Sequence, residues 1–270
     1  MQYQPVLPEE NNNISHIHPL RDFATLLAGT LATLFLLYLI LGLLVDRAVN
    51  HISPATELKI FSHTPAAWAG PETEEEDERL AKVQGLTQRL ALSLEISVPI
   101  TVHIADVEAV NAVALPGGHI VVFAGLLERM KTENGLGFIL AHELGHFKNR
   151  DHLRGLGRGL VLMAMAATLT GPDSSLTQLV TPTMQLGQAR YSQGREFMAD
   201  EVGLRGVQAL YGHVGGATEL FELIGREEGD GLPLSHYFAS HPQTAERLAR
   251  LADIAGAAGW QSLSPIALTF

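Results

Sequence analysis

The chain has 270 residues, of which 46% are hydrophobic, and its 29 acidic residues against 18 Lys and Arg give a formal charge of −11. This apolar share excludes an intrinsically disordered chain, and the acidic balance argues against a nucleic-acid partner, because phosphate groups are neutralised by a basic surface. Cysteine is absent, which excludes disulfides, Cys-ligated zinc, iron–sulfur clusters and thiol nucleophiles.

An uncharged, proline-free apolar segment, residues 23–45, lies between Arg21-Asp22 and Asp46-Arg47. As a helix it would measure about 35 Å, enough to cross a hydrocarbon core of about 30 Å. We therefore predict a tail over 1–22 and a transmembrane helix over 23–45. The alternatives are a buried core helix, which is usually shorter and more polar, and a signal peptide, whose apolar region is usually only about 7–15 residues long. The flanking basic residues are too evenly divided to predict the orientation.

The composition changes after the predicted span. Residues 46–73 contain Ser-Pro, Thr-Pro and Gly-Pro pairs and are predicted to be a linker. The acidic run Glu72–Glu78 then begins a predicted helix over 79–94, where carboxylates complement the positive end of the helix dipole. We interpret this run as a solvated helix start rather than a metal site.

A small sheet is predicted next. Residues 100–104, ITVHI, have strand character, and residues 109–115 and 119–123 flank a Pro116-Gly117-Gly118 turn, which is typical of a hairpin. From Gly125 onward the pattern is almost entirely helical. The predicted fold class is therefore α+β and predominantly helical, with a small sheet and one preceding membrane helix.

The motif that carries chemistry is His-Glu-Leu-Gly-His over residues 142–146, within a helical apolar pattern. Residues i and i+4 lie on one helix face, so His142 and His146 can direct two imidazoles at one ion. Glu143 then lies beside the pair without binding the ion, where it can take a proton from a metal-activated water. The motif is short and also arises by chance, so a further ligand has to support it.

A carboxylate suited to be the third ligand follows in the segment YSQGREFMAD. Glu196 and Asp200 lie one turn apart on a helix, so Glu196 can bind the metal while Asp200 accepts a hydrogen bond from a ligating histidine. The alternative interpretation is two surface acids on an exposed helix. Histidines 51, 103, 152 and 213 have no partner pattern and are predicted to be structural.

With these motifs in place, the sequence resembles the membrane-associated zinc metallopeptidases that include the HtpX-type heat-shock proteases and the CAAX prenyl proteases, within the gluzincin group. The resemblance covers about residues 75–255. It rests on four segments in the order of the family, namely NAVALPGGHIVV (111–122), ILAHELGHFKNRDHLR (139–154), YSQGREFMAD (191–200) and SHPQTAER (240–247).

The resemblance implies a gluzincin-type domain over 74–256, followed by a C-terminal tail over 257–270. It implies one Zn²⁺ per chain, with His142, His146 and Glu196 as ligands, Glu143 as catalytic base and Asp200 as supporting acid. The sequence departs from the family at one point, because Gln193 stands where the family commonly has Arg. The charge that anchors this helix is then missing, or Arg190 or Arg195 supplies it.

Two further segments have two interpretations each. His241-Pro242 can simply open a final helix capped by Ser240, but by resemblance His241 is also a candidate for a removable fourth ligand, and Arg247 for oxyanion stabilisation or substrate docking. The strand that contains Asn111, Ala112, Val113 and Ala114 can be ordinary hairpin core, but by resemblance it is an edge to which an extended substrate peptide adds.

Residues 159–172 and 174–189 are uncharged but each is too short to span a bilayer. In the heat-shock relatives this interval carries transmembrane segments, so here it is expected to be a shortened hairpin that covers the cleft or dips into the bilayer, or alternatively two buried helices of the domain.

Together these features predict a membrane-anchored zinc endopeptidase that hydrolyses unfolded or misfolded polypeptides in the quality control of membrane or envelope proteins. The expected location is the bacterial inner membrane, with residues 23–45 in the bilayer and the periplasmic side favoured for the catalytic domain. The alternative is a membrane-tethered, non-proteolytic zinc protein that binds unfolded chains. Glu143 distinguishes the two, because a structural zinc site is closed by four ligands and has no use for a neighbouring unbound carboxylate. A prenyl-peptide protease would require a chamber of several spans.

Overall fold

The computed structural model describes residues 19–62, 78–172, 174–175, 192–227, 241 and 245–270, and the structural statements below concern these residues. Some predictions lie outside them. These concern the tail before residue 19, the second part of the linker with most of the acidic run, the uncharged stretch 176–189, and Ser240 and Pro242 beside His241.

The described elements confirm a mostly helical chain with a small sheet. In chain order they are α1 (Pro19–Val49), α2 (Pro54–Ile60), α4 (Glu78–Ser93), β1 (Thr101–Ala105), β2 (Ala112–Leu115), β3 (His119–Phe123), α5 (Ala124–Arg129), α6 (Glu133–Lys148), α7 (Asp151–Thr170), α9 (Gln193–Tyr211), α10 (Glu219–Glu227) and α12 (Ala245–Ala258).

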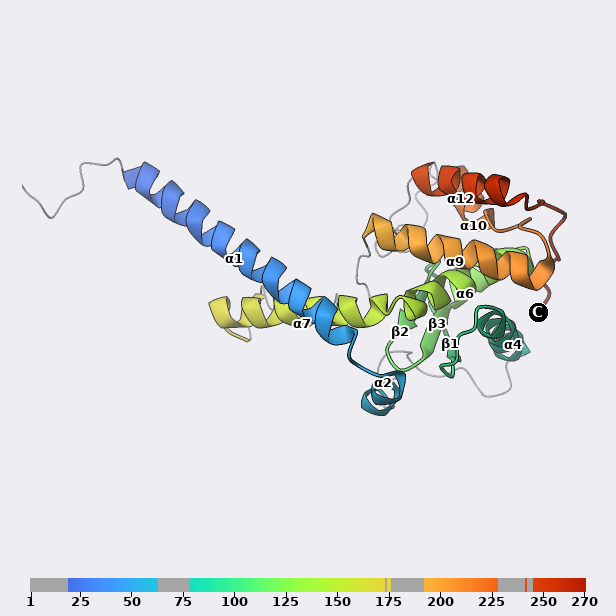
Figure 1. Ribbon diagram of the computed structural model, residues 1–270, viewed down its shortest axis with the longest axis horizontal. Coiled ribbons are helices and arrows are strands. Elements are labelled where there is room, and N and C mark those ends of the chain that lie inside the picture. The colour runs from blue at the N-terminus through green and yellow to red at the C-terminus, as the bar shows by residue number, and fades with distance from the viewer. Residues whose placement is uncertain (1–18, 63–77, 173, 176–191, 228–240, 242–244) are drawn as a thin grey trace, which may run out of the picture.

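Helix α1 contains the whole predicted span and extends it at both ends. It projects away from most of the other elements (Figure 1), and of its residues only Gly42 and Val49 are buried. Large apolar side chains such as Phe23, Leu31 and Phe35 are more than half exposed. Burial against protein therefore does not explain this composition, whereas a helix of this length and hydropathy fits a membrane anchor.

The three strands form one mixed sheet in the order β1-β3-β2. Strand β1 runs parallel to β3, and β2 pairs with β3 in the antiparallel direction. The predicted hairpin around Pro116-Gly117-Gly118 is confirmed, although β2 begins at Ala112 and not at residue 109. Because β2 is at the edge of the sheet, the backbone groups on its outer side pair with no strand of the described residues.

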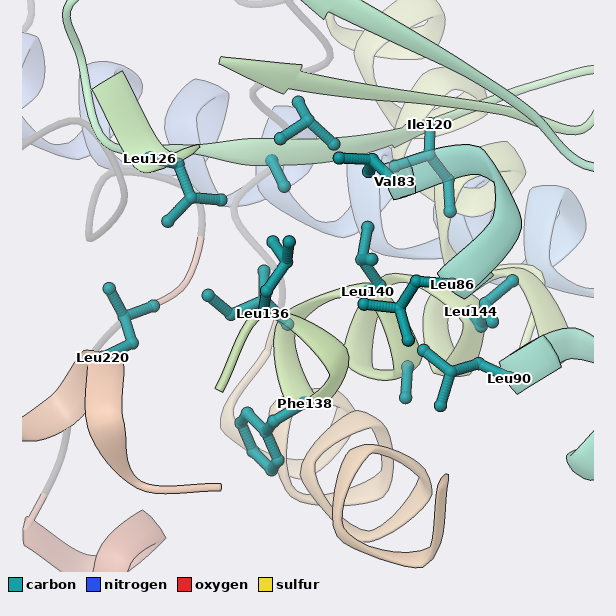
Figure 2. Packing of buried hydrophobic residues seen from close by; sticks show 14 of the residues in the cluster. Val83, Leu86, Leu90, Ile120, Leu126, Leu136, Phe138, Leu140, Leu144 and Leu220 are labelled. Atoms are coloured by element: carbon teal, nitrogen blue, oxygen red, sulfur yellow. The ribbon is translucent and has the colours of Figure 1, made fainter. Parts of the chain in front are cut away.

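Helix α6 lies at the centre of the domain, between α9 on one side and the sheet with α4 on the other (Figure 1). Leu136, Leu140 and Leu144 follow the i, i+4 spacing of one helix face and point toward Ile120 of β3 and toward Leu86 of α4 (Figure 2). Every residue of α6 from Asn134 to Phe147 is buried. A helix covered on all sides holds its side chains rigidly, which suits it to carry a site.

Helices α6 and α9 approach closely where their sequence motifs meet. A Cβ atom added to Gly145 would lie 2.9 Å from the Cα of Ala199, closer than real side chains come to a backbone. Glycine at this position therefore lets the HELGH turn of α6 approach the Glu196–Asp200 turn of α9.

Helix α7 continues the chain after α6 and packs against α1 (Figure 1). Its second half, residues 159–170, carries no charge and exposes Leu160, Leu162 and Leu169. The first of the two predicted uncharged helices is thus part of α7, and its exposed leucines show that it is not a buried core helix.

The predicted linker and the predicted C-terminal tail each make hydrogen bonds to the domain. Helix α2 lies inside the predicted linker, and Oε1 of its buried Glu57 is 2.7 Å from Nε2 of His152. In the predicted C-terminal tail, the carbonyl of Ile266 accepts a hydrogen bond from the N–H of Glu133 at the start of α6, at 2.9 Å.

Candidate metal centre

Two buried imidazoles meet on one face of α6. The hydroxyl of Thr132 accepts a hydrogen bond from the N–H of Gly135 and so caps the helix that carries them. One turn apart on this helix, His142 and His146 are both 0% exposed, and their Nε2 atoms are 3.1 Å apart. The i, i+4 spacing in the sequence therefore produces the predicted pairing of the two rings.

Helix α9 brings the predicted carboxylate to this pair. The carboxylate oxygens of Glu196 lie 3.7 Å from Nε2 of His142 and 3.5 Å from Nε2 of His146. Glu196 is 0% exposed, so the alternative of a surface acid does not hold. Three donors from two helices thus converge on one buried point.

His241, which comes from just before α12, completes this group. Its Nδ1 is 3.3 Å from Nε2 of His142 and 3.2 Å from Oε1 of Glu196. One ligand atom from each of these residues and from His146 can be chosen so that all four lie within 4.8 Å of one another. Three imidazole nitrogens and one carboxylate oxygen are a donor set that zinc accepts in proteins, so the residues fit the metal that the sequence predicts.

Both imidazoles of α6 are oriented by carboxylates behind them. Nδ1 of His142 is 3.0 Å from Oδ1 of Asp200, and Nδ1 of His146 is 3.1 Å from Oδ2 of Asp151. Each ring therefore presents Nε2 to the centre of the group, as metal-binding histidines with a carboxylate partner do. Asp200 was predicted for this place.

Asp151 was missed by the sequence reasoning. It follows His146 by five residues, beyond the end of α6, so helical spacing does not place it near the ring. Arg150, which directly precedes α7, has φ +58°, and this left-handed residue separates α6 from α7. The signal available in the sequence was only an acid shortly after the HELGH helix.

Glu143 lies beside the four donors. It is 0% exposed, and its Oε2 accepts a hydrogen bond of 2.9 Å from the backbone N–H of Ala114 in β2. Its Oε1 lies 3.5 Å from Nε2 of His241 and accepts no hydrogen bond within the described part of the chain. A buried carboxylate oxygen without a donor is costly, and here it faces the group of donors.

Arg247 reaches the site from α12 and is 0% exposed. Its Nε and Nη2 each donate to Asp200 at 2.7 Å, and its Nη1 is 2.9 Å from Oε2 of Glu196. The guanidinium thus holds both carboxylates of α9, with the bidentate geometry that favours arginine at such places.

These partners keep the two carboxylates of α9 ionised. Burial by itself would raise the pKa of Glu196 and of Asp200, but the charge of His241 acts on the first and the hydrogen bonds of Arg247 act on the second, and both pKa values are lowered. An ionised carboxylate is the form that binds a cation.

The two imidazoles of α6 differ in their electrostatics. Burial lowers the pKa of His142, and its hydrogen bond with Asp200 offsets only part of this effect. Burial also opposes charge on His146, but the hydrogen bonds with Asp151 and Glu196 outweigh it and raise the pKa of His146 to about 9. The pKa values of the two histidines on α6 are thus shifted in opposite directions, although both rings lie on the same helix face.

Comparison with known proteins identifies the domain that carries this geometry. Residues 77–255 match the sequence profile of Peptidase family M48. The chain belongs to this family. The M48 match contains all of the metal-centre residues and confirms the predicted family and fold class.

Proteins similar in sequence to this M48 domain are named as proteases. The chain is 31% identical over 172 residues to metalloprotease LoiP of Escherichia coli, which covers 60% of this chain and 65% of that protein. It is 29% identical over 147 residues to the mitochondrial metalloendopeptidase OMA1 of Arabidopsis thaliana, covering 53% and 29%, and 27% identical over 168 residues to a protease HtpX homolog of Salinibacter ruber, covering 52% and 60%. The chain thus spans less than two thirds of each of these relatives.

Helix α9, which carries the third predicted ligand Glu196, begins with Gln193, the residue at which the sequence departs from the family. Its contacts show how this departure is accommodated. Gln193 donates to Glu246 at the surface, at 2.7 Å, whereas Nη1 of Arg195 lies 3.1 Å from Asp151. Of the two arginines considered, Arg190 lies outside the described residues, and Arg195 makes the ion pair with the buried Asp151.

Proposed function

We propose that the chain is a membrane-anchored zinc endopeptidase that hydrolyses peptide bonds of unfolded or misfolded polypeptides. The observation that carries this proposal is Glu143, a buried carboxylate with one oxygen held by Ala114 and the other directed at the donor group. A site that only stabilised the fold would not require such a group beside the metal. Membership of a peptidase family and relatives named as metalloproteases support the same function.

The proposed zinc ligands are His142, His146 and Glu196. When bound, zinc supplies a Lewis acid that makes a water more acidic and polarises the scissile carbonyl. The donor chemistry and the orienting carboxylates behind the rings support this assignment.

Glu143 is the proposed general base and acid. Its Oε1 accepts the proton of the attacking water and then delivers it to the leaving amine, while the N–H of Ala114 holds Oε2 and keeps the carboxylate in position. The general base is thereby attached to the edge strand of the sheet.

We assign the substrate to this edge strand. The N–H of Phe123 donates to the carbonyl of Asn111, so by the antiparallel alternation the peptide groups of Ala112 and Ala114 face away from β3, whereas those of Val113 face it. The outer N–H groups of Ala112 and Ala114 already donate to Oδ1 of Asn111 and to Oε2 of Glu143, so we assign the pairing with an extended peptide to the outer carbonyls of β2, beside Glu143. Pairing through the backbone tolerates many sequences, which suits unfolded chains as substrates.

His241 has the proposed role of a removable fourth ligand. Its Nδ1 contacts both His142 and Glu196 while its Nε2 faces Glu143, so it occupies the space that a water and a scissile carbonyl would need. A catalytic zinc site keeps one position open. The arrangement with His241 inside is therefore the closed form of the enzyme.

For Arg247 the contacts favour a positioning role. Its three guanidinium nitrogens bind Asp200 and Glu196, and stabilisation of an oxyanion would require Arg247 to leave one of these carboxylates. We therefore propose that it acts through Glu196 and Asp200.

The location follows from α1. The exposed apolar side chains of α1 support a membrane anchor, and the proposed compartment is the periplasmic face of the bacterial inner membrane, in the quality control of membrane or envelope proteins. A topology reporter fused after Phe270 tests the side of the membrane.

The decisive experiment uses the full-length protein in detergent, with metal content and cleavage of casein measured for the wild type and for Glu143→Gln. We expect about one zinc per chain in both, and a loss of cleavage of roughly 10²–10⁴-fold in the variant, the range of general-base catalysis. If the wild type and a His241→Ala variant both bound zinc and neither cleaved any unfolded protein, the non-proteolytic binding protein would be the better explanation.

A further inference from the structure

The carboxylate behind His146 is itself held by a cation. Asp151, 2% exposed at its side chain, directs Oδ2 at Nδ1 of His146, 3.1 Å away, and Oδ1 at Nη1 of Arg195, also 3.1 Å away. Its two oxygens thus face two different partners. Arg195 immediately precedes the proposed ligand Glu196 in α9, so this contact connects the start of α9 with the start of α7, next to the end of α6 that carries His146.

Arg195 also reaches the membrane anchor. Its Nη2 lies 3.5 Å from Oδ1 of Asp46, near the C-terminal end of α1. This Oδ1 is buried and accepts no hydrogen bond within the described residues, so the ion pair with Arg195 is its electrostatic partner there. Asp46 is the first charged residue after the predicted span of 23–45.

Asp46 has little freedom to move. Its Oδ2 is 2.5 Å from Nη2 of Arg158, and its backbone carbonyl accepts a hydrogen bond of 3.2 Å from Arg154, both on α7. The two helices touch at this level, since a Cβ added to Gly157 would lie 2.5 Å from Cγ1 of Val45. The anchor therefore presents Oδ1 of Asp46 to Arg195 in a defined position.

We propose that Asp46 is a positioning residue for the zinc ligand His146, acting through Arg195 and Asp151. The inference rests on the proposed metal site. Without Asp46, Arg195 loses one of the two carboxylates that hold its guanidinium, and the orientation of Asp151 toward His146 is less well determined. The end of the membrane helix thus contributes to metal binding and does more than tether the domain.

The expected loss of metal affinity depends on how many contacts separate the changed residue from the ligand His146. Removing a carboxylate in direct contact with a ligand histidine typically costs roughly 10–100-fold in metal affinity, which is the expected effect of Asp151→Asn. Asp46 acts two contacts further out, through Arg195 and Asp151, and is 28% exposed at its side chain. We therefore expect a smaller loss for Asp46→Asn, about fivefold, on the same scale.

The test measures zinc affinity of the full-length protein in detergent, by competition with a chromophoric chelator, together with the visible spectrum of the cobalt-substituted protein. Asp22→Asn is the matched control, because it removes the same charge at the far end of α1. Val45→Ala loosens the contact with α7 without touching a charge. We expect weaker zinc binding and an altered cobalt spectrum for Asp46→Asn, with both controls close to wild type.

A double-mutant cycle decides whether the effect passes through Asp151. In an Asp151→Asn background, Asp46→Asn should add almost nothing to the loss of affinity. The proposal is overturned if Asp46→Asn binds zinc as tightly as Asp22→Asn, if Val45→Ala weakens zinc binding as much, or if the two losses simply add. Should the wild type bind no zinc, the proposed function itself fails; an intact wild type with an unaffected Asp46 variant refutes only the positioning role.

Discussion

The backbone N–H of Ala114 donates a hydrogen bond of 2.9 Å to Oε2 of Glu143. This bond joins the edge strand of the sheet to the central helix of the domain. The strand proposed to receive the substrate and the residue proposed to move the proton are therefore parts of one rigid unit, and a peptide bound along β2 is positioned relative to the base by the same backbone.

The length of the Glu143 side chain should be critical for this reason. Glu143→Asp keeps the charge but withdraws the carboxylate by one methylene, so it cannot both accept from Ala114 and reach the donor group. A misplacement of this kind costs about 100-fold in rate. We expect such a loss in kcat/KM for casein-derived peptides with zinc content unchanged, and near-normal activity would contradict the proposed geometry.

Replacing His241 should open the site. If His241 is a removable ligand, His241→Ala should bind zinc more weakly, since one donor of four is lost, while cleavage of unfolded substrates rises. His213→Ala removes another buried histidine, which accepts a hydrogen bond only from the nearby backbone of Gly215 among the bonds described, and should leave cleavage unchanged. Lower cleavage in His241→Ala at full zinc occupancy would argue that His241 assists the reaction.

Glu57 should make stability depend on pH. Burial alone would raise its pKa, but hydrogen bonds and charge from His152, with hydrogen bonds from Gly117 and Arg150, lower the pKa from 4.5 to about 2. A carboxyl whose pKa is lower in the folded state stabilises the fold above its unfolded pKa, and this contribution is lost as the pH falls from about 4.5 toward about 2.

Glu57→Gln tests this contribution. The variant should be less stable than the wild type by on the order of 2–3 kcal/mol at pH 7, and the difference should shrink steadily in denaturant unfolding at pH 4 and pH 3. A difference that stays constant with pH would show that Glu57 acts through packing and not through its charge.

Gly145 should tolerate no side chain. Because an added Cβ would lie 2.9 Å from the backbone of Ala199, Gly145→Ala should push α6 from α9 and cost about 1–3 kcal/mol of stability. His146 would move relative to Glu196, so zinc binding should weaken as well. Gly85→Ala in α4 is the control, since nothing lies within 4 Å of its added Cβ and alanine favours helix by about 1 kcal/mol; equal effects at both positions would refute the close-approach argument.

Local spacing was enough to predict the long apolar helix α1, the hairpin and the HELGH helix. Each of these features is local in the sequence. The helix period, or the turn between two neighbouring strands, determines which side chains share a face. The pairing of Glu196 with Asp200 across one turn was predictable in the same way, and the need of the HELGH motif for a third ligand pointed to Glu196.

The contacts between elements were decided by tertiary structure. The spacing of α6 does not direct Asp151 to His146, because the left-handed residue Arg150 ends the helical geometry between them. Likewise, the bond between Ala114 and Glu143 depends on how the sheet packs on α6.

The sequence alone determined the chemistry of this protein, because the donor types and their helical spacing are local properties. Tertiary structure decided which groups support that chemistry. His241 reaches His142 from 99 residues away, and Asp46 of α1 meets Arg195. Such contacts depend on how whole helices pack, and close approaches such as Gly145 against Ala199 and Gly157 against Val45 determine that packing.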